Sequence, residues 1–394
     1  MNTTIKRFLL LSVFAATFVS CSSDDDNNTT APALDGVITS LTDADYSATD
    51  LKGNIGADIT LPVGEYILNG ALVVKSPYTL TILPGTTFKA TAGGTAIYVA
   101  VEQGAKINAA GSATAPIRFT SNASNKRSGD WGGLLIMGRA PLSGGGTATT
   151  EVVDFTYGGT VNNDNSGTLS YVIVEYSGAR INGEKEFNGI TFYGVGNGTT
   201  VNNIASLNGD DDAIEFFGGS VNVTNVLVVN AKDDMLDWTQ GYTGTINNAY
   251  AIRELGFNDI TSDPRGIEAD GNLDGLSPTQ AGQSDVTVTN VTIVNNSIVS
   301  LNDIIKIRRG SKATITNCLV KQGNTTPAPG DLVDCSDTLG SAAAGTTVTL
   351  VGSGTNLNLA DNNLGSNAAT VNATAGSTGG ANTSVLTWTG YTFN

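Results

Sequence analysis

Charged residues recur at one position of a short apolar repeat in this chain. The repeat is a tripeptide whose outer two positions are apolar in all six copies. Successive side chains of a β-strand point to opposite faces, so one face would enter a core and the other would carry a column of charge. Stacked carboxylates could bind a hard cation or serve as the acid and base of glycoside hydrolysis. The six middle residues are Thr191, Glu215, Asp237, Glu268, Lys306 and Asp334.

A second charged column lies two residues before the first apolar position of the tripeptide. Two carboxylates about 5 Å apart repel each other by roughly 1 kcal/mol in water and roughly 3 kcal/mol at an effective dielectric constant of 20. A bound cation, raised pKa values or interleaved bases would relieve this repulsion. We expect Lys306 to act as such a base between Glu268 and Asp334. The second column reads Asp212, Asp234, Arg265, Asp303 and Asp331.

The acidic part of the two columns predicts a Ca²⁺ site. Its expected ligands are Asp212, Glu215, Asp234 and Asp237, because Ca²⁺ takes several hard oxygen ligands. The alternative is a solvated acidic stripe that keeps the sheet soluble and blunts aggregation.

A second Ca²⁺ candidate follows Glu268 directly. Asp270, Asn272 and Asp274 place oxygen ligands at alternate positions and a glycine stands at the sixth, as in the first half of an EF-hand loop. Ala281 occupies the twelfth position, where that motif carries its bidentate glutamate. The ligand set would therefore need completion from elsewhere, and the alternative is an Asx-rich turn.

A repeated asparagine indicates which elements position these charges. Asn203, Asn225 and Asn248 each stand in a pattern of an apolar residue, a spacer, asparagine and an apolar residue, at spacings of 22 and 23 residues, and the pattern returns at Asn290 and Asn317. Repeats of this length predict a parallel β-solenoid, and asparagine suits its corners because it tolerates left-handed backbone. A β-sandwich with Asn-rich turns is the alternative, but sandwich turns do not repeat one residue in register.

The composition supports an all-β fold. The chain has 394 residues, 48 of them glycine, and it shows no long amphipathic helical pattern. A solenoid grows by adding coils, so we expect one domain over residues 36–394, with an N-terminal cap at residues 36–80 and the C-terminal coils and cap at residues 336–394. Within the second cap, Trp388, Tyr391 and Phe393 are expected to pack over the last coil.

Long excursions interrupt the regular period. The coil from Asn248 to Asn290 has nearly twice the usual length. Such excursions often form the walls of a binding site, although tolerated surface insertions are the alternative. The surplus falls at residues 138–168, 253–265 and 270–285.

Aromatic residues near these excursions could stack on sugars. Tyr242, Phe257 and Tyr193 are the candidates for such ligand contacts, together with the charged residues of the first column. Phe216 and Trp238 are expected to point into the core instead, because they occupy the inward positions of their tripeptides.

The N-terminus predicts an export signal. Residues 1–20 have a basic start and an apolar run too short to span a bilayer, as in a signal peptide, and the run ends directly before Cys21. We expect Cys21 to be lipidated and residues 21–35 to form an acidic, flexible tether. A soluble secreted protein with an odd cysteine is the alternative. The acidic residues 24–26 after Cys21 resemble the surface-export signal of Bacteroidota-type lipoproteins. This resemblance implies a lipid-anchored outer-membrane protein that faces the cell exterior, and a merely solvated tether is the alternative.

Four segments carry a resemblance to a known group. They are Pro84–Thr86, Asp130–Leu134, Asp211–Gly219 and Asp233–Trp238. Together they resemble uncharacterised surface lipoproteins of the Bacteroidota type that have a right-handed, pectate-lyase-like parallel β-helix. The resemblance implies three sheets, with about 22–23 residues per coil by the asparagine spacing. It also implies that the asparagine corner lies between the second and third sheets. The charged tripeptides would then lie in the first sheet, where pectate-lyase-like enzymes bind their polymer.

Whether the chain is an enzyme stays open, and we favour a non-catalytic protein. It has no histidine, which excludes Ser-His-Asp and Cys-His machinery. Glu215, Asp237 and Glu268 could still act as paired carboxylates. The resemblance implies that a Ca²⁺-dependent polysaccharide lyase could use Arg265 or Lys306 as its base. The simpler interpretation makes both residues ion-pair partners of the neighbouring acids.

The partners follow from charge and context. A net charge of −16 argues against nucleic acid. We expect a monomer that binds an extracellular polysaccharide or another surface component. A stiff spacer in a surface layer is a third possibility. Cys318 and Cys335 could form a disulfide or remain buried thiols.

Overall fold

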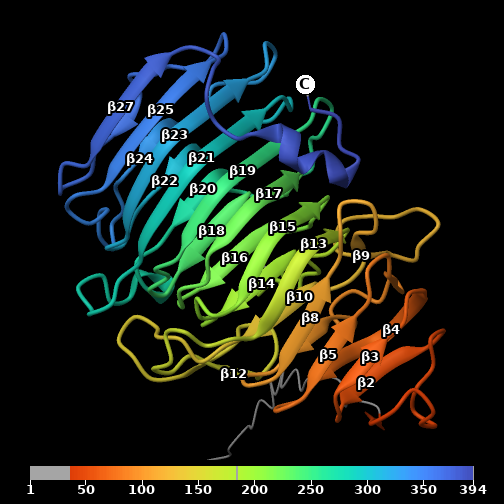
Figure 1. Cartoon of the computed structure of the whole chain (residues 1–394). Helices are drawn as coiled ribbons and strands as arrows, with labels where there is room; N and C mark the ends of the chain where they lie inside the picture. The colour runs from red at the N-terminus through yellow and green to blue at the C-terminus, as the bar shows by residue number, and fades with distance from the viewer. Residues whose placement is uncertain (1–35, 183–184, 394) are drawn as a thin grey trace, which may run out of the picture. The chain divides into compact units, whose positions relative to one another are not determined.

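The parallel β-helix predicted from the sequence is the observed fold. A computed structural model describes residues 36–182 and 185–393 (Figure 1). The predicted signal peptide, Cys21 and the tether at residues 21–35 lie outside the described residues. Apart from one short hairpin, the strands hydrogen-bond to one another in parallel. No helix in the described part of the chain is long and apolar enough to cross a membrane.

The first sheet carries the charged tripeptides. Short strands stack in register along it, and each coil of the helix contributes one of them. Its strands are β1 (Val37–Ile38), β2 (Leu51–Ile55), the end of β4 (Glu65–Val74), β7 (Val99–Val101), β10 (Leu134–Met137), β14 (Ile190–Tyr193), β16 (Ile214–Phe217), β18 (Leu236–Thr239), β20 (Arg265–Ala269), β22 (Asp303–Lys306), β24 (Asp331–Asp334) and β26 (Asn362–Asn363).

The second and third sheets begin as separate strands and then share long ones. The second sheet starts with β3 (Ile59–Leu61), β5 (Thr79–Ile82) and β8 (Lys106–Ala110), and the third with the start of β4, β6 (Thr87–Ala90) and β9 (Ile117–Ser121). The first half of β13 (Gly167–Glu175) then pairs with β8 and its second half with β9. From there on, one long strand per coil serves both sheets. These strands are β15 (Thr200–Leu207), β17 (Val223–Val229), β19 (Thr245–Arg253), β21 (Asp285–Asn295), β23 (Lys312–Gln322), β25 (Thr347–Ser353) and β27 (Thr370–Ala375).

The predicted asparagine corner lies where these long strands bend from the second sheet into the third. Asn203, Asn225 and Asn248 have φ values of 52°, 61° and 62°, in the left-handed region. The Asn225 side-chain amide donates to Asn203 Oδ1 at 3.1 Å, and the Asn248 amide donates to Asn225 Oδ1 at 2.8 Å. The ladder breaks at the long coil, where Asn290 donates to Asn247 instead. The corner residue therefore bends its own strand and binds the coil before it.

Aromatic side chains and two cysteines are part of the core. Phe216 and Trp238 are fully buried, as expected. Phe216 stacks on Tyr242 with ring centroids 4.4 Å apart. Cys318 and Cys335 are buried free thiols in the structure, which is one of the two arrangements expected from the sequence.

Regular strands reach close to both ends of the described chain. Residues 51–82 already supply strands to the coils, and residues 347–375 do the same at the other end. The last segment, residues 376–393, then runs back along the outer face of the third sheet (Figure 1). It includes the 3₁₀ helix η2 (Thr383–Thr389). We call this segment the C-terminal strap.

Three aromatic residues of the C-terminal strap were expected on the last coil, and this expectation is wrong. Trp388 packs edge-on against Tyr171 with ring centroids 5.2 Å apart, and Phe393 packs edge-on against Tyr250 with ring centroids 5.1 Å apart. Tyr391 packs against Phe393 and donates a hydrogen bond to Glu254. These contacts reach coils in the middle of the solenoid, because apolar side chains on the outer face of the third sheet offer more area there for burial.

Asn225→Ala should destabilise the solenoid. Alanine in the left-handed region costs about 1–2 kcal/mol, and the lost ladder bonds add about 1 kcal/mol. We expect the free energy of unfolding to fall by about 2–3 kcal/mol in urea titrations followed by circular dichroism. The neighbouring Thr224→Ala is the control and should change it much less. Equal losses in the two variants would contradict a special role for the corner.

Candidate functional site

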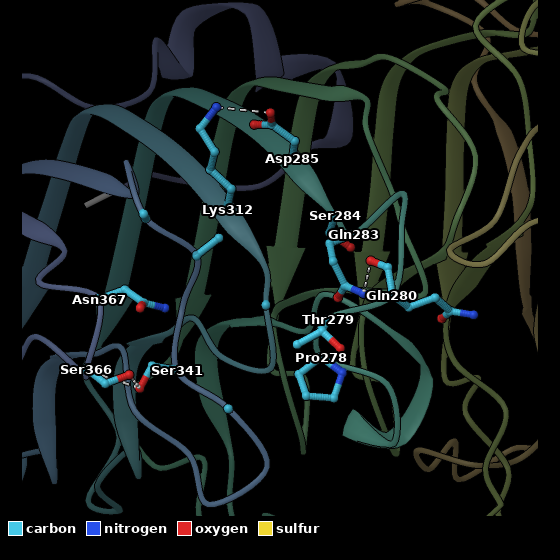
Figure 2. Close-up of a pocket in the computed structure, with 14 residues that line it drawn as sticks. Pro278, Thr279, Gln280, Gln283, Ser284, Asp285, Lys312, Ser341, Ser366 and Asn367 are labelled. Carbon is cyan, nitrogen blue, oxygen red and sulfur yellow. Dashed lines mark hydrogen bonds and ion pairs between the residues drawn. The ribbon is translucent and has the colours of Figure 1, made fainter.

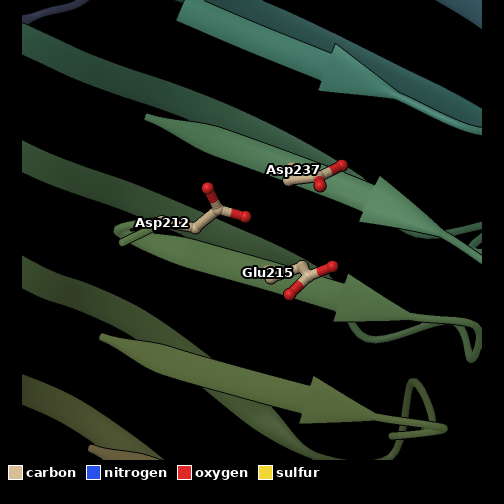
Figure 3. Close-up of side chains that lie close together, drawn as sticks. All are labelled: Asp212, Glu215 and Asp237. Carbon is tan, nitrogen blue, oxygen red and sulfur yellow. The ribbon is translucent and has the colours of Figure 1, made fainter. Parts of the chain in front are cut away.

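The charged column has the register that the sequence predicts. Glu215 of β16 pairs with Asp237 of β18, and Asp237 pairs with Glu268 of β20. Further along, Lys306 of β22 pairs with Asp334 of β24. Parallel pairing without a shift places like positions of successive coils next to one another, so the carboxylates stack (Figure 3).

Three carboxylates of neighbouring coils converge on one point. Asp212, Glu215 and Asp237 each offer an oxygen within 4.8 Å of the others (Figure 3). Asp212 precedes β16, and Glu215 and Asp237 are middle residues of β16 and β18. Two further groups of the same kind share their members, namely Asp212 with Asp233 and Asp234, and Asp234 with Asp237 and Glu268. We call Asp212, Glu215, Asp234 and Asp237 the acidic cluster.

The acidic cluster lines a cavity of about 310 Å³. Two of the predicted excursions contribute to its walls, with Glu151 from residues 138–168 and Thr261–Asp263 from residues 253–265. Most of the residues that line the cavity carry carboxylates. Arg180 also lines it and forms ion pairs with Asp210 and Asp211. The remaining lining residues are Glu186, Asp211, Asp212, Glu215, Asp233, Asp234, Asp237 and Glu268.

Burial makes the acidic cluster electrostatically costly. Burial, and then the charge of Asp234, raises the pKa of Asp212 well above its usual value. Burial and the charge of Asp237 also raise the pKa of Glu215. Burial and the charge of Glu268 raise the pKa of Asp237 in the same way. Loss of contact with water disfavours the charged form of a carboxyl group, and so does the negative charge of a neighbouring carboxylate. The cluster therefore favours either protonation or a bound cation.

The acidic cluster lacks the direct ion pairs that the rest of the column has, although the charge of Arg265 acts on Asp234 and that of Arg308 on Asp237. In the described part of the chain, no lysine or arginine forms a salt bridge with any of its four members. Asn188 donates to Glu215, and the backbone N–H of Asp234 donates to Asp212 at 2.9 Å. The Oδ1 atoms of Asp234 and Asp237 are buried without a hydrogen-bond partner among the described residues. Asp234 is 3% exposed and Asp237 9%.

Beyond the cluster, bases neutralise the column. Glu268 forms ion pairs with Arg265 and with Arg308, the latter at 2.7 Å. Burial raises the pKa of Glu268 to about 7, although both arginines oppose the rise. Lys306 pairs with Asp334 as expected, but it does not bridge to Glu268. That part of the expectation is corrected, because Arg265 and Arg308 occupy the carboxylate of Glu268.

The candidate lyase bases Arg265 and Lys306 both form ion pairs with carboxylates. Burial alone would lower the pKa of Arg265, but Glu268, Asp234 and further acids reverse this and raise it. A guanidinium stabilised in this way is a poor proton acceptor. Lys306 lies against Asp334 and within 3.8 Å of Asp303. Both residues fit the simpler interpretation as ion-pair partners.

The half EF-hand loop does not present the side chains of Asp270 and Asn272 as ligands. Asp270 Oδ1 accepts from Arg308 and Oδ2 from Arg309, each at 2.7 Å. Asn272 Oδ1 accepts the backbone N–H of Ser277 at 2.8 Å, and its amide donates to Arg309 O. The segment continues as the 3₁₀ helix η1 (Leu273–Gly275), and the side chain of Asp274 lies outside the described residues. The Asx-rich turn is therefore the better description, since arginines already hold the carboxylate of Asp270.

Two of the three aromatic candidates are buried. Tyr242 has no exposed surface, stacks on Phe216 and donates its hydroxyl to Val221 O at 2.7 Å. Tyr193 is 1% exposed and packs beneath residues 138–168. Neither can stack on a sugar, which corrects the prediction. Phe257 is half-buried, and the Arg253 guanidinium lies 5.9 Å from its ring centroid.

Arg253 is a site residue that the sequence reasoning missed. Its fully buried guanidinium donates to the backbone carbonyls of Ala231, Lys232 and Asp233. These bonds fix the turn that presents Asp233 and Asp234 to the cavity. The sequence did contain a signal for this residue. Ile252 pairs with Val229 of the preceding coil, so Arg253 stands at the position that Asn230 occupies there. Asn230 is a second corner asparagine with positive φ, and the arginine breaks that repeat.

A larger depression lies elsewhere on the molecule. Its volume is about 590 Å³, and it runs from Pro278 and Gln280 of the 270–285 excursion to Asn367 (Figure 2). Its charged residues, Lys312 and Asp285, form an ion pair with each other at 3.0 Å. None of the described side chains that line it has a buried polar atom without a hydrogen-bond partner, so the smaller acidic cavity is the better candidate site.

Asp237→Asn should stabilise the metal-free protein at neutral pH. A raised folded-state pKa means that the native state binds the proton more tightly than the unfolded state. The free energy of unfolding therefore falls as pH rises above about 4, the region of an unfolded aspartate. We expect a higher melting temperature than wild type near pH 7 in chelator, measured by calorimetry, and a smaller difference near pH 4. A difference that grows towards acid pH would refute this electrostatic account.

Comparison with known proteins places the fold in a family. Searches of curated proteins and of solved structures return no match for the chain. The model of the pectate-lyase-like β-helix domain matches residues 53–392, which is nearly the whole described chain. This match and the parallel coils agree with the right-handed solenoid expected from the sequence. The chain therefore belongs to the family of pectate-lyase-like β-helix domains.

Proposed function

We propose that the protein binds Ca²⁺ in the acidic cavity and, through it, an acidic extracellular glycan or another acidic surface component, without catalysis. The observation that carries the proposal is the pair of buried Oδ1 atoms of Asp234 and Asp237, which have no hydrogen-bond partner among the described residues and belong to two residues that line the cavity. A buried carboxylate oxygen with no donor is costly, and a cation would remove that cost.

The donor set suits Ca²⁺. The acidic cluster offers carboxylate oxygens from three directions, and Ca²⁺ accepts six to eight oxygens in flexible geometry. The set contains no histidine and no cysteine, so it is a poor match for zinc or copper. Arg253 would position Asp233 and Asp234 for the ion.

The glycan part of the proposal rests on the open side of the cavity. An ion held by carboxylates on the sheet keeps coordination positions for oxygens from outside. An acidic ligand would supply these oxygens and would otherwise be repelled by the carboxylates of the lining. We further propose that the chain is lipid-anchored through Cys21 in the outer membrane and faces the exterior, on the sequence of residues 1–35.

A second candidate function is a Ca²⁺-dependent polysaccharide lyase or glycoside hydrolase at the same place. The raised pKa values of Glu215 and Asp237 favour it, because a raised pKa makes a carboxyl a better candidate for a general acid. Against the lyase, Arg265 and Lys306 are engaged with carboxylates. The non-catalytic function therefore stands first.

Ca²⁺ should stabilise the wild-type protein, and loss of one cluster carboxylate should abolish the effect. At a hundred times the dissociation constant, the free ion raises the free energy of unfolding by about 2.7 kcal/mol. We expect heat on calorimetric titration with Ca²⁺, lost in Asp212→Asn and in Asp237→Asn. Asp285→Asn is the matched control, since this aspartate is exposed and lies outside the cluster. Titration without heat or thermal shift in the wild type would end the proposal.

Glycan binding should depend on the ion. On an array of acidic and neutral polysaccharides, we expect acidic polymers to be retained with Ca²⁺ and released by chelator, and Asp237→Asn to retain none. Retention that chelator does not change would contradict the role given to the ion. Incubation of the retained polymers should leave their length unchanged, and shortened chains or unsaturated uronate products would support the catalytic alternative.

A further inference from the structure

The C-terminal end of the solenoid carries an unprotected strand edge. β27 pairs with β25 on one side, and no other strand in the described part of the chain pairs with it. It is six residues long, and none of its residues is fully buried. Natural proteins blunt such edges with charges, prolines, bulges or covering segments. The sequence of β27, Thr-Val-Asn-Ala-Thr-Ala, contains neither a charge nor a proline.

The backbone groups of this edge alternate between the two sides. The N–H of Thr370 donates to Thr346 O at 3.0 Å, and the N–H of Gly376 donates to Gly352 O at 3.0 Å. Along a parallel strand the bonding direction alternates from residue to residue. The N–H and C=O groups of Val371, Ala373 and Ala375 therefore point away from β25, towards the open side.

The apolar interior also reaches this end. Leu357, Leu359, Val371 and Ala373 pack on the core but are only partly buried. The C-terminal strap does not cover them, because it leaves the last coil and runs back to residues such as Tyr171 (Figure 1). Both a hydrogen-bonding edge and an apolar surface are thus available for a partner.

Charge separates this end from the rest of the chain. Residues 338–394 contain one charged side chain, Asp361, in a protein of net charge −16. The first coil, in contrast, carries Asp43, Asp50, Lys52 and further charges. Two copies repel each other wherever their acidic surfaces meet, and they repel least where their last coils meet.

We propose that the last coil binds the last coil of a second copy of this chain, with β27 antiparallel to its counterpart across a two-fold axis. A two-fold contact joins the same surface of both copies and closes, so it yields a dimer and no filament. Head-to-tail stacking would set the uncharged edge against the charged first coil. The inference does not depend on Ca²⁺ or glycan binding, and it departs from the monomer expected from the sequence.

Sedimentation velocity of the purified full chain over a range of concentrations tests the dimer. We expect a reversible monomer–dimer equilibrium that shifts towards dimer as salt screens the net charge. Ala373→Pro and Ala375→Pro each remove one N–H that points to the open side and keep every bond to β25, so both should lose the dimer with little change in melting temperature. Ala373→Ser keeps the N–H and is the matched control, which should dimerise like the wild type.

Three results would overturn the proposal. They are a wild-type chain that stays monomeric at every concentration, a dimer that survives in both proline variants, and a ladder of species beyond the dimer, which would indicate head-to-tail stacking. Ala375 lies exposed at the end of the strand, so Ala375→Pro keeps the test valid even if Ala373→Pro impairs folding.

Discussion

In-register stacking of parallel coils is the constraint on which this structure depends. Each coil hydrogen-bonds to the next through its backbone, so a residue type repeated at the coil period must lie against its own kind. For asparagine this stacking is favourable, because the side-chain amide of one coil donates to that of the coil before it and each asparagine adopts the same left-handed corner conformation. For aspartate and glutamate the same geometry brings like charges together. The fold thus creates the asparagine ladder and the acidic column by one mechanism.

The column resolves its repulsion in two different ways along its length. From Glu268 onwards, guanidinium and ammonium groups lie between the acids and pair with them. In the preceding coils, the acidic cluster has no such partners among the described residues, and its pKa values rise instead. The molecule therefore has a compensated half and an uncompensated half on one sheet. The walls from residues 138–168 and 253–265 rise around the uncompensated half, which gives that half its cavity.

Much of this could be read from the sequence, because periodicity reports register directly. The spacing of Asn203, Asn225 and Asn248 predicts the coil, and the parity of Glu215 and Asp237 predicts the stacked column. Periodicity does not report what happens outside the strands. Tyr242 lies beyond the end of β18, where alternation no longer applies, and its ring turns inward onto Phe216. Arg308 lies in the turn after β22 and forms an ion pair with Glu268 of the preceding coil. No local sequence pattern indicates a contact between residues so far apart in the chain.

The C-terminal strap alters how such a solenoid can come apart. Coils that contact only their neighbours can fray from an end one at a time. Here the backbone of Asn382 binds the side chain of Asn248, and Gly380 binds that of Asn317. Leu386 and Trp388 reach still earlier coils. Fraying of the last coils must therefore pull on the middle of the molecule, so coils far apart in sequence share one cooperative unfolding unit.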